Sequence, residues 1–154
     1  MTSYPRITSF HLAQLNIALM KYQYEAPEMA EFVNNLDRIN ALAEESPGFV
    51  WRLQTEEGDA TSIDFYGPDT LVNMSIWKDS KSLHDYVYRT SHAQIMSRRK
   101  EWFNRFDDSY TVLWWIPAGT IPTLEEANER LELLRSQGPT AAAFTFKQTF
   151  AAPD

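Results

Sequence analysis

The chain has 154 residues, the size of one domain with a buried core, and we expect a single domain over residues 1–154. Hydrophobic residues make up 44% of it and aromatic residues 14%, which excludes a disordered protein. The net charge of −7, without a basic stripe, argues against nucleic acid and anionic membrane surfaces as partners. The lack of cysteine excludes disulfides and thiolate metal sites, and it fits a cytoplasmic location.

The first part of the chain predicts a strand, a helix and a second strand. Residues 11–20 alternate, and Gln14 and Asn16 fall on the less apolar face. Residues 27–45 carry an apolar stripe at helical spacing. Residues 49–54 alternate again, which places Phe49, Trp51 and Leu53 together on one face.

A polar loop and a third strand come next. Residues 55–70 are polar, and we expect a mobile loop that becomes ordered over a bound ligand. Residues 71–77 alternate: one face is apolar, and the other carries Asn73, Ser75 and Trp77. This second face combines hydrogen-bonding groups with a large ring, as a ligand-binding face does.

The next segment predicts a helix in two pieces that runs to Phe106. Asp79 or Ser80 can cap the first piece. Ser91 and Gln94 fit a capping box, which makes His92 the first residue of the second piece.

The last third predicts a strand over residues 110–116, a helix over 124–137 capped by Thr123, and a strand over 142–150. The first six elements then run β-α-β-β-α-β, the ferredoxin-like order, with an extra C-terminal α-β. The fold class is therefore α+β. Helices would cover one sheet face, and the sheet of a second copy would cover the other, giving a homodimer.

His92 and Arg99 are the candidates for chemistry. Unpaired N–H groups at a helix start disfavour an imidazolium, so His92 would stay neutral and could accept a proton or bind a metal. A histidine there also suits a solvent-facing or turn-capping position. Arg99 falls inside an apolar stripe, where it either passes along the rings of Trp102 and Phe103 or points into a cavity toward an anionic or carbonyl-bearing ligand.

Several motifs resemble a bacterial family of uncharacterised domains within the dimeric α+β barrel superfamily, which includes the antibiotic-biosynthesis monooxygenases. They are residues 11–16 (HLAQLN), 40–44 (NALAE), 46–51 (SPGFVW), Trp77, Tyr86, His92, Arg98, Trp102-Phe103, and 126–140 from Glu126-Ala127 to Gly138-Pro139-Thr140. The resemblance covers nearly the whole chain. It implies the dimeric barrel fold but no particular reaction, because fold does not fix function.

Three functions are the resulting hypotheses. The first is a cofactor-independent, monooxygenase-like or cyclase-like enzyme for a flat, apolar or aromatic substrate, with His92 as general base and Arg99 or Asn73 at the resulting oxyanion. Its substrate-binding residues would be Gln14, Asn16, Trp51, Asn73, Ser75 and Trp77. The second is haem binding with His92 as axial ligand. The third is a dimeric, non-catalytic module for a small ligand, since the sequence has no paired carboxylates on one face and no metal-ligand cluster.

Overall fold

The computed structural model describes residues 9–54, 65–90 and 92–153. Its elements, in chain order, are β1 (Phe10–Met20), the 3₁₀ helix η1 (Pro27–Met29), α1 (Ala30–Glu45), β2 (Phe49–Arg52), β3 (Thr70–Trp77), α2 (Ser80–Arg89), α3 (His92–Ser97), the 3₁₀ helix η2 (Arg99–Glu101), β4 (Phe103–Asn104), β5 (Thr111–Pro117) and α4 (Leu124–Gln137).

The strands form one antiparallel sheet around β1. β3 pairs with one edge of β1, and β2 pairs with the outer edge of β3. The other edge of β1 pairs with β5 over most of its length and with the short β4 at its end. The order β2-β3-β1-β5 is that of a ferredoxin-like sheet, so the predicted α+β class is confirmed.

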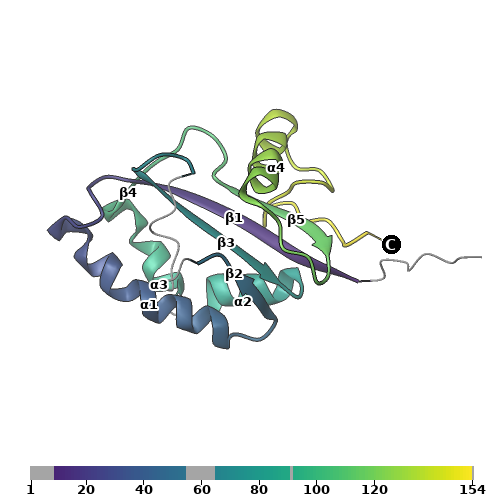
Figure 1. Cartoon of the computed structure of the whole chain (residues 1–154), viewed down its shortest axis with the longest axis horizontal. Coiled ribbons are helices and arrows are strands. Elements are labelled where there is room, and N and C mark those ends of the chain that lie inside the picture. Colours follow the sequence, from purple (N-terminus) through teal and green to yellow (C-terminus); the bar gives the residue numbers. More distant parts are fainter. Residues whose placement is uncertain (1–8, 55–64, 91, 154) are drawn as a thin grey trace, which may run out of the picture.

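Helices lie on both sides of this sheet, as Figure 1 shows: α1, α2 and α3 on one side and α4 on the other. We call these the α1 face and the α4 face. On the α4 face, Leu131 and Leu134 of α4 belong to one core cluster with Leu15, Val112 and Trp114 of the sheet, and none of the five is more than 4% exposed. The expectation that all helices gather on one face is therefore wrong. The chain covers its second apolar face with its own α4, which removes the need for a second sheet there.

Two apolar clusters occupy the α1 face. The first joins Leu12, Trp77 and Leu113 of the sheet to α1 and α2. The second lies at the far end of β1 and includes Ala18, Met20 and Trp102. Because side chains on one strand face recur every second residue, residues 14 and 16 of β1 lie between the two clusters.

The predicted strand over residues 142–150 is reduced to isolated bridges, of which one connects it to the sheet. Phe144 pairs with Leu113 of β5, with backbone hydrogen bonds of 2.8 and 2.9 Å, and its ring is fully buried. The Trp115 indole donates to the backbone oxygen of Phe150 at 2.8 Å. Buried rings hold this C-terminal segment in place, and one backbone pair joins it to the sheet.

The second helical piece is shorter than the sequence predicts. α3 ends at Ser97, and Phe103 pairs with Met20 as part of β4. The Lys21 amide also donates to the Trp102 carbonyl at 2.8 Å. Pairing with the end of β1 satisfies backbone groups that a continued helix would use, so tertiary contacts override the helical pattern.

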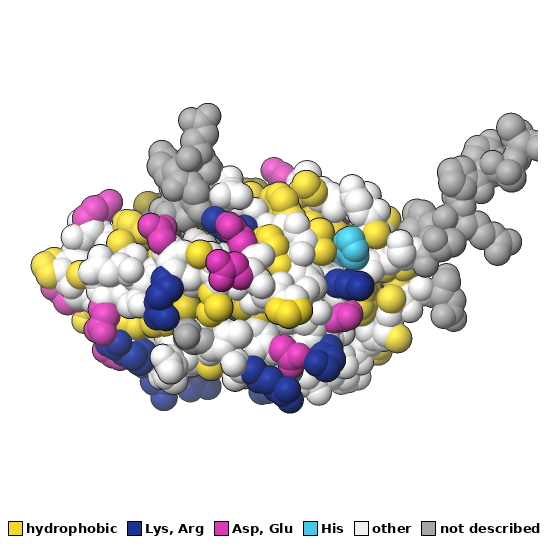
Figure 2. Space-filling model, turned by 90° about the horizontal axis from the view of Figure 1, so that it is seen from below, with side chains coloured by type: hydrophobic (Ala, Val, Ile, Leu, Met, Phe, Trp, Pro, Cys, Tyr) yellow, Lys and Arg dark blue, Asp and Glu magenta, His cyan; other side chains and the backbone are white. Residues whose placement is uncertain are grey.

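Side-chain caps start two helices as expected. Asp79 accepts from the Ser82 amide at the start of α2, and Thr123 accepts from the Glu126 amide at the start of α4. Seen from the α1 face, acidic and basic side chains are interspersed with hydrophobic ones (Figure 2). No helix within the described ranges has the length and apolar character to cross a bilayer.

Candidate functional site

Polar side chains lie between the two apolar clusters of the α1 face. These residues, which we call the polar belt, are Gln14, Asn16, Asn73, Ser75 and Thr111. Gln14 and Ser75 are buried, whereas Asn73 is exposed, so the belt reaches solvent at Asn73. The structure thus brings together all the predicted polar site residues of β1 and β3.

Hydrogen bonds connect the belt across three strands. The Gln14 amide Nε2 donates to Asn73 Oδ1 at 2.6 Å and to Ser75 Oγ at 2.8 Å. Asn16 Nδ2 donates to Thr111 Oγ1 at 2.6 Å. In this arrangement the Asn73 amide nitrogen, on the exposed residue, has no acceptor within the described residues. It is therefore a donor available to a ligand.

Stacked rings link the belt to His92. The Trp77 indole donates to Ser75 Oγ at 2.8 Å, and its ring stacks on Tyr86 with centroids 5.0 Å apart. Tyr86 in turn contacts His92 at 4.9 Å between centroids. Trp77 is fully buried, so it supports Tyr86 from behind and does not face a ligand as the sequence predicted.

His92 is held at the junction of α2 and α3 with one ring nitrogen engaged. Its Nδ1 lies 3.2 Å from the carbonyl oxygen of Val87, which fixes the tautomer with hydrogen on Nδ1. Nε2 has no hydrogen-bond partner within the described residues, and so carries an available lone pair. Burial lowers the pKa of His92, and the bond to Val87 opposes that shift in part. His92 is thus neutral at pH 7.

The cause of this neutrality differs from the prediction. α3 has only six residues, and burial is the main cause that lowers the pKa, where we expected a helix N-terminus. Ser91, the predicted cap, lies outside the described residues. The Thr90 hydroxyl accepts from the His92 amide at 3.2 Å instead.

A β-bulge separates Trp51 from the other predicted site residues. The pairing of β2 with β3 shifts between Phe49 and Trp51, so Phe49 lies opposite Trp77 and Trp51 lies opposite Ile76. An extra residue in a strand moves the residues after it to the other face. Trp51 therefore packs on the α4 face and cannot stack on a ligand together with Trp77.

The same bulge places Arg52 on the α1 face, a position that strand alternation alone did not single out. Arg52 is 9% exposed, lies opposite Ser75, and pairs with Glu44 of α1 at 2.8 Å. Burial raises the pKa of the Tyr86 hydroxyl, and the Arg52 charge acts against that rise. The sequence signal available was an arginine between Trp51 and Leu53 in a predicted strand, but the face that it occupies depends on the bulge.

Arg99 lies apart from the belt. Its guanidinium sits over the Tyr110 ring at 4.5 Å, and Tyr110 packs against the cluster of the α4 face. The expectation that Arg99 runs along the Trp102 ring is therefore wrong, and the guanidinium of its neighbour Arg98 lies 5.0 Å from the centre of that ring instead.

Two other expectations concern a lid and metals. Residues 55–64 of the predicted lid loop lie outside the described residues. Within the described part of the chain, no three histidine, aspartate or glutamate side chains are grouped so as to hold a metal ion.

The fold and the site define an α+β protein with a ferredoxin-like sheet, a polar belt on the α1 face, and a partly buried neutral histidine that Tyr86 and Trp77 link to this belt. The family model described as "Domain of unknown function (DUF3291)" matches residues 11–154. The chain therefore belongs to this family. No curated protein matches it.

Several solved structures resemble the chain. SnoaB, a cofactor-independent oxygenase from Streptomyces nogalater, is 14% identical over 73% of this chain and 97% of its own, with a TM-score of 0.45. A protein of unknown function from Nitrosomonas europaea is 16% identical over 74% and 96%, with a TM-score of 0.46. A conserved protein from Methanosarcina mazei is 17% identical over 71% and 94%, with a TM-score of 0.48. At identities and TM-scores this low, none of them supplies a function for the chain.

Proposed function

We propose that the chain is a small-molecule enzyme of monooxygenase-like or cyclase-like type, which acts on a flat, apolar or aromatic substrate with His92 as general base. The observation that carries this proposal is the state of the His92 ring. Its Nδ1 is engaged by the Val87 carbonyl, the ring is neutral, and Nε2 has no partner within the described residues. An oriented neutral imidazole with one available nitrogen is suited to removing a proton.

The polar belt supplies the other groups that such a reaction needs. Loss of a phenolic or enolic proton to Nε2 leaves an anion on the substrate oxygen. The Asn73 amide nitrogen is a donor that can stabilise this oxyanion. We assign Asn73 this role in preference to Arg99, because the Arg99 guanidinium lies on Tyr110. No step of this kind requires a bound cofactor.

The test is a substrate screen with matched histidine variants. Purified protein is incubated with a panel of hydroxylated naphthalenes and β-diketones, and products are followed by liquid chromatography and oxygen uptake. His92→Asn should lower any turnover by about 10²- to 10⁴-fold, the usual contribution of a general base. His84→Asn, on the exposed side of α2, should not. Full activity in His92→Asn would overturn the role of His92.

Haem binding is the second candidate, favoured by the same ring. Haem-ligating histidines commonly donate Nδ1–H to a carbonyl and bind iron through Nε2. In His92, Nδ1 lies against the Val87 carbonyl, which leaves Nε2 as the nitrogen that would bind iron. If haem binds, added haem should give a Soret absorption band that His92→Asn removes and His84→Asn keeps. A spectrum identical to that of free haem would exclude this alternative.

The third candidate is a non-catalytic binding module. In that case, a compound of the panel would quench the tryptophan fluorescence and protect the protein against thermal unfolding without being converted.

We also propose that the protein is cytoplasmic, that its chain forms a single domain, and that two copies form a homodimer. Because α4 covers the second sheet face, the two copies would meet through another surface. Light scattering at micromolar concentration tests this, and a monomeric mass would contradict it.

A further inference from the structure

α3 is weakly anchored although it carries His92. None of its residues is fully buried. Its Ile95 packs against both apolar clusters of the α1 face, which lie on either side of the polar belt. α3 therefore spans from one cluster to the other on the belt side of the sheet. A helix with so little buried surface needs other contacts to keep its position.

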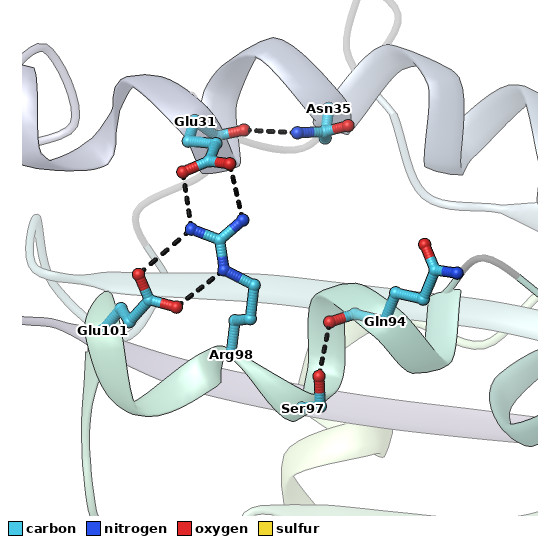
Figure 3. A network of polar contacts seen from close by, with 6 residues as sticks. All are labelled: Glu31, Asn35, Gln94, Ser97, Arg98 and Glu101. Atoms are coloured by element: carbon cyan, nitrogen blue, oxygen red, sulfur yellow. Dashed lines mark hydrogen bonds and ion pairs between the residues drawn. The ribbon is translucent and has the colours of Figure 1, made fainter.

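Arg98, directly after α3, supplies such contacts, as Figure 3 shows. Its two terminal nitrogens donate to the two carboxylate oxygens of Glu31 at 2.6 and 2.5 Å. Its Nε and one terminal nitrogen donate to Glu101 at 2.6 and 3.0 Å. The guanidinium also lies over Trp102, which is 2% exposed. A bidentate ion pair above an aromatic ring fixes both the position and the orientation of the guanidinium.

The two carboxylates differ in what they connect. Glu101 lies three residues from Arg98 on the same segment, so that bond is local. Glu31 belongs to the first turn of α1, a helix whose only buried residues, Ile39 and Ala43, lie in its second half. The bond from Arg98 to Glu31 is thus a polar tie between the segment that directly follows α3 and the first half of α1, and it lies beside the apolar contacts of Phe32 with Trp102 and Phe103.

We propose that Arg98 is a positioning residue: through Glu31 it holds α3, and with it His92, in place over the polar belt. An effect of Arg98 on catalysis rests on the proposed function of His92, whereas its effect on the position of α3 does not. Loss of the tie lets α3 move away from α1, which opens the belt to solvent and exposes the His92 ring. Loss of the local bond to Glu101 leaves the tie in place.

Thiol labelling tests access to the belt. The chain has no cysteine, so Ser75→Cys introduces a unique thiol at a position that is 7% exposed. Its reaction with methyl methanethiosulfonate is followed by mass spectrometry in three backgrounds: the otherwise native chain, Glu31→Gln and Glu101→Gln. Glu31→Gln should raise the labelling rate roughly two- to fivefold, the factor that an exposed ion pair contributes to an opening equilibrium. Glu101→Gln should leave the rate unchanged.

Equal rates in Glu31→Gln and in the native background would overturn the proposal, and so would labelling in the native background as fast as that of a free thiol. An equal acceleration by both variants would also overturn it, because a local charge effect would then suffice.

Proton NMR of the His92 ring gives a second readout, on chains that keep Ser75. The His92 pKa should rise toward its ordinary value in Glu31→Gln and in Arg98→Ala, since burial lowers it in the intact protein. Arg98→Lys should restore it only in part, because an ammonium group cannot reproduce the bidentate ion pair. Arg89→Ala removes an exposed arginine from α2 without touching α1 and should leave the titration unchanged.

An unchanged His92 titration in Arg98→Ala would overturn the positioning role. Neither experiment requires turnover. Full activity of His92→Asn would therefore refute the proposed function and leave the positioning role of Arg98 standing. Equal labelling rates in Glu31→Gln and in the native background would refute the positioning role and leave the proposed function standing.

Discussion

Tyr86 stacks on Trp77 with their ring centroids 5.0 Å apart and 25° between the ring planes. The stack joins α2 to β3, since Trp77 is the last residue of its strand and Tyr86 lies in the middle of its helix. The Tyr86 hydroxyl donates to the Ile39 carbonyl of α1 at 3.2 Å, and its ring contacts His92. One tyrosine thus connects the sheet, α1 and the candidate base.

Removal of the Tyr86 ring should therefore lower the free energy of unfolding far more than removal of its hydroxyl. Tyr86→Ala loses a buried ring and should lower the free energy of unfolding by about 3–5 kcal/mol. Tyr86→Phe keeps the stack and loses one hydrogen bond to a carbonyl that stays in the helical ladder of α1, and it should lower the free energy of unfolding by about 0.5–1.5 kcal/mol. Urea denaturation measures both. Tyr88→Ala, at a half-exposed position of the same helix, is the control and should change stability little. Similar losses at 86 and 88 would contradict the stack's role.

The stability of the fold should depend on pH through His92. Its pKa is lowered in the folded protein, while the unfolded chain titrates near the ordinary value of about 6.5. Below that pH the unfolded state binds more protons than the folded state. The contribution of neutral His92 to the free energy of unfolding is therefore fully present above about pH 6.5 and is lost as the pH falls.

Urea denaturation at about pH 7.5 and about pH 5.5 isolates this contribution when His92→Asn is compared with the native chain. The variant should lose less stability between the two pH values than the native chain does, whereas His84→Asn should behave like the native chain. An identical loss in all three proteins would show that His92 does not titrate differently on folding.

Anchoring of the C-terminal segment should depend on one ring. Phe144 is fully buried against Leu113 and Phe150, so Phe144→Ala should cost about 3–5 kcal/mol of unfolding free energy. Phe146 is only partly buried, against the exposed His84 and Tyr88 of α2, and Phe146→Ala should cost clearly less. Thermal unfolding followed by circular dichroism ranks the two, and the reverse order would be incompatible with the packing described.

Two glycines with positive φ should respond differently to alanine. Gly48 (φ +84°) joins α1 to β2, and a Cβ there would overlap the Ser82 side chain of α2. Gly119 (φ +89°) has open space at the same position. Gly119→Ala should cost about 1 kcal/mol from backbone strain alone. Gly48→Ala should cost more, because α2 must also shift. Equal losses in urea denaturation would indicate that Ser82 yields without cost.

The strand periodicity of β1 and β3 was sufficient to predict four of the five residues of the polar belt, whereas Thr111 of β5 joins them through its pairing with Asn16. Ala13, Leu15 and Ile17 share one face and Gln14 and Asn16 the other, as the sequence indicates. Both strands are central in the sheet and regular along their length, so alternation translates directly into faces. The same alternation failed at Trp51, because a bulge depends on how β2 pairs with β3, which no local pattern encodes.

The sequence by itself determined the order of the longer strands and helices up to residue 137, a helix cap at Asp79 or Ser80 and another at Thr123, the polar face of β1 and β3, and the candidacy of His92. These follow from spacing and local hydrogen bonding, which neighbouring residues decide. Only the tertiary structure decided that α4 covers the second face, that residues 103–104 leave the helix to pair with β1, and that Arg99 lies on Tyr110 while Arg98 ties α3 to α1. Each of these depends on contacts between segments far apart in the chain, where burial of apolar surface outweighs local preference.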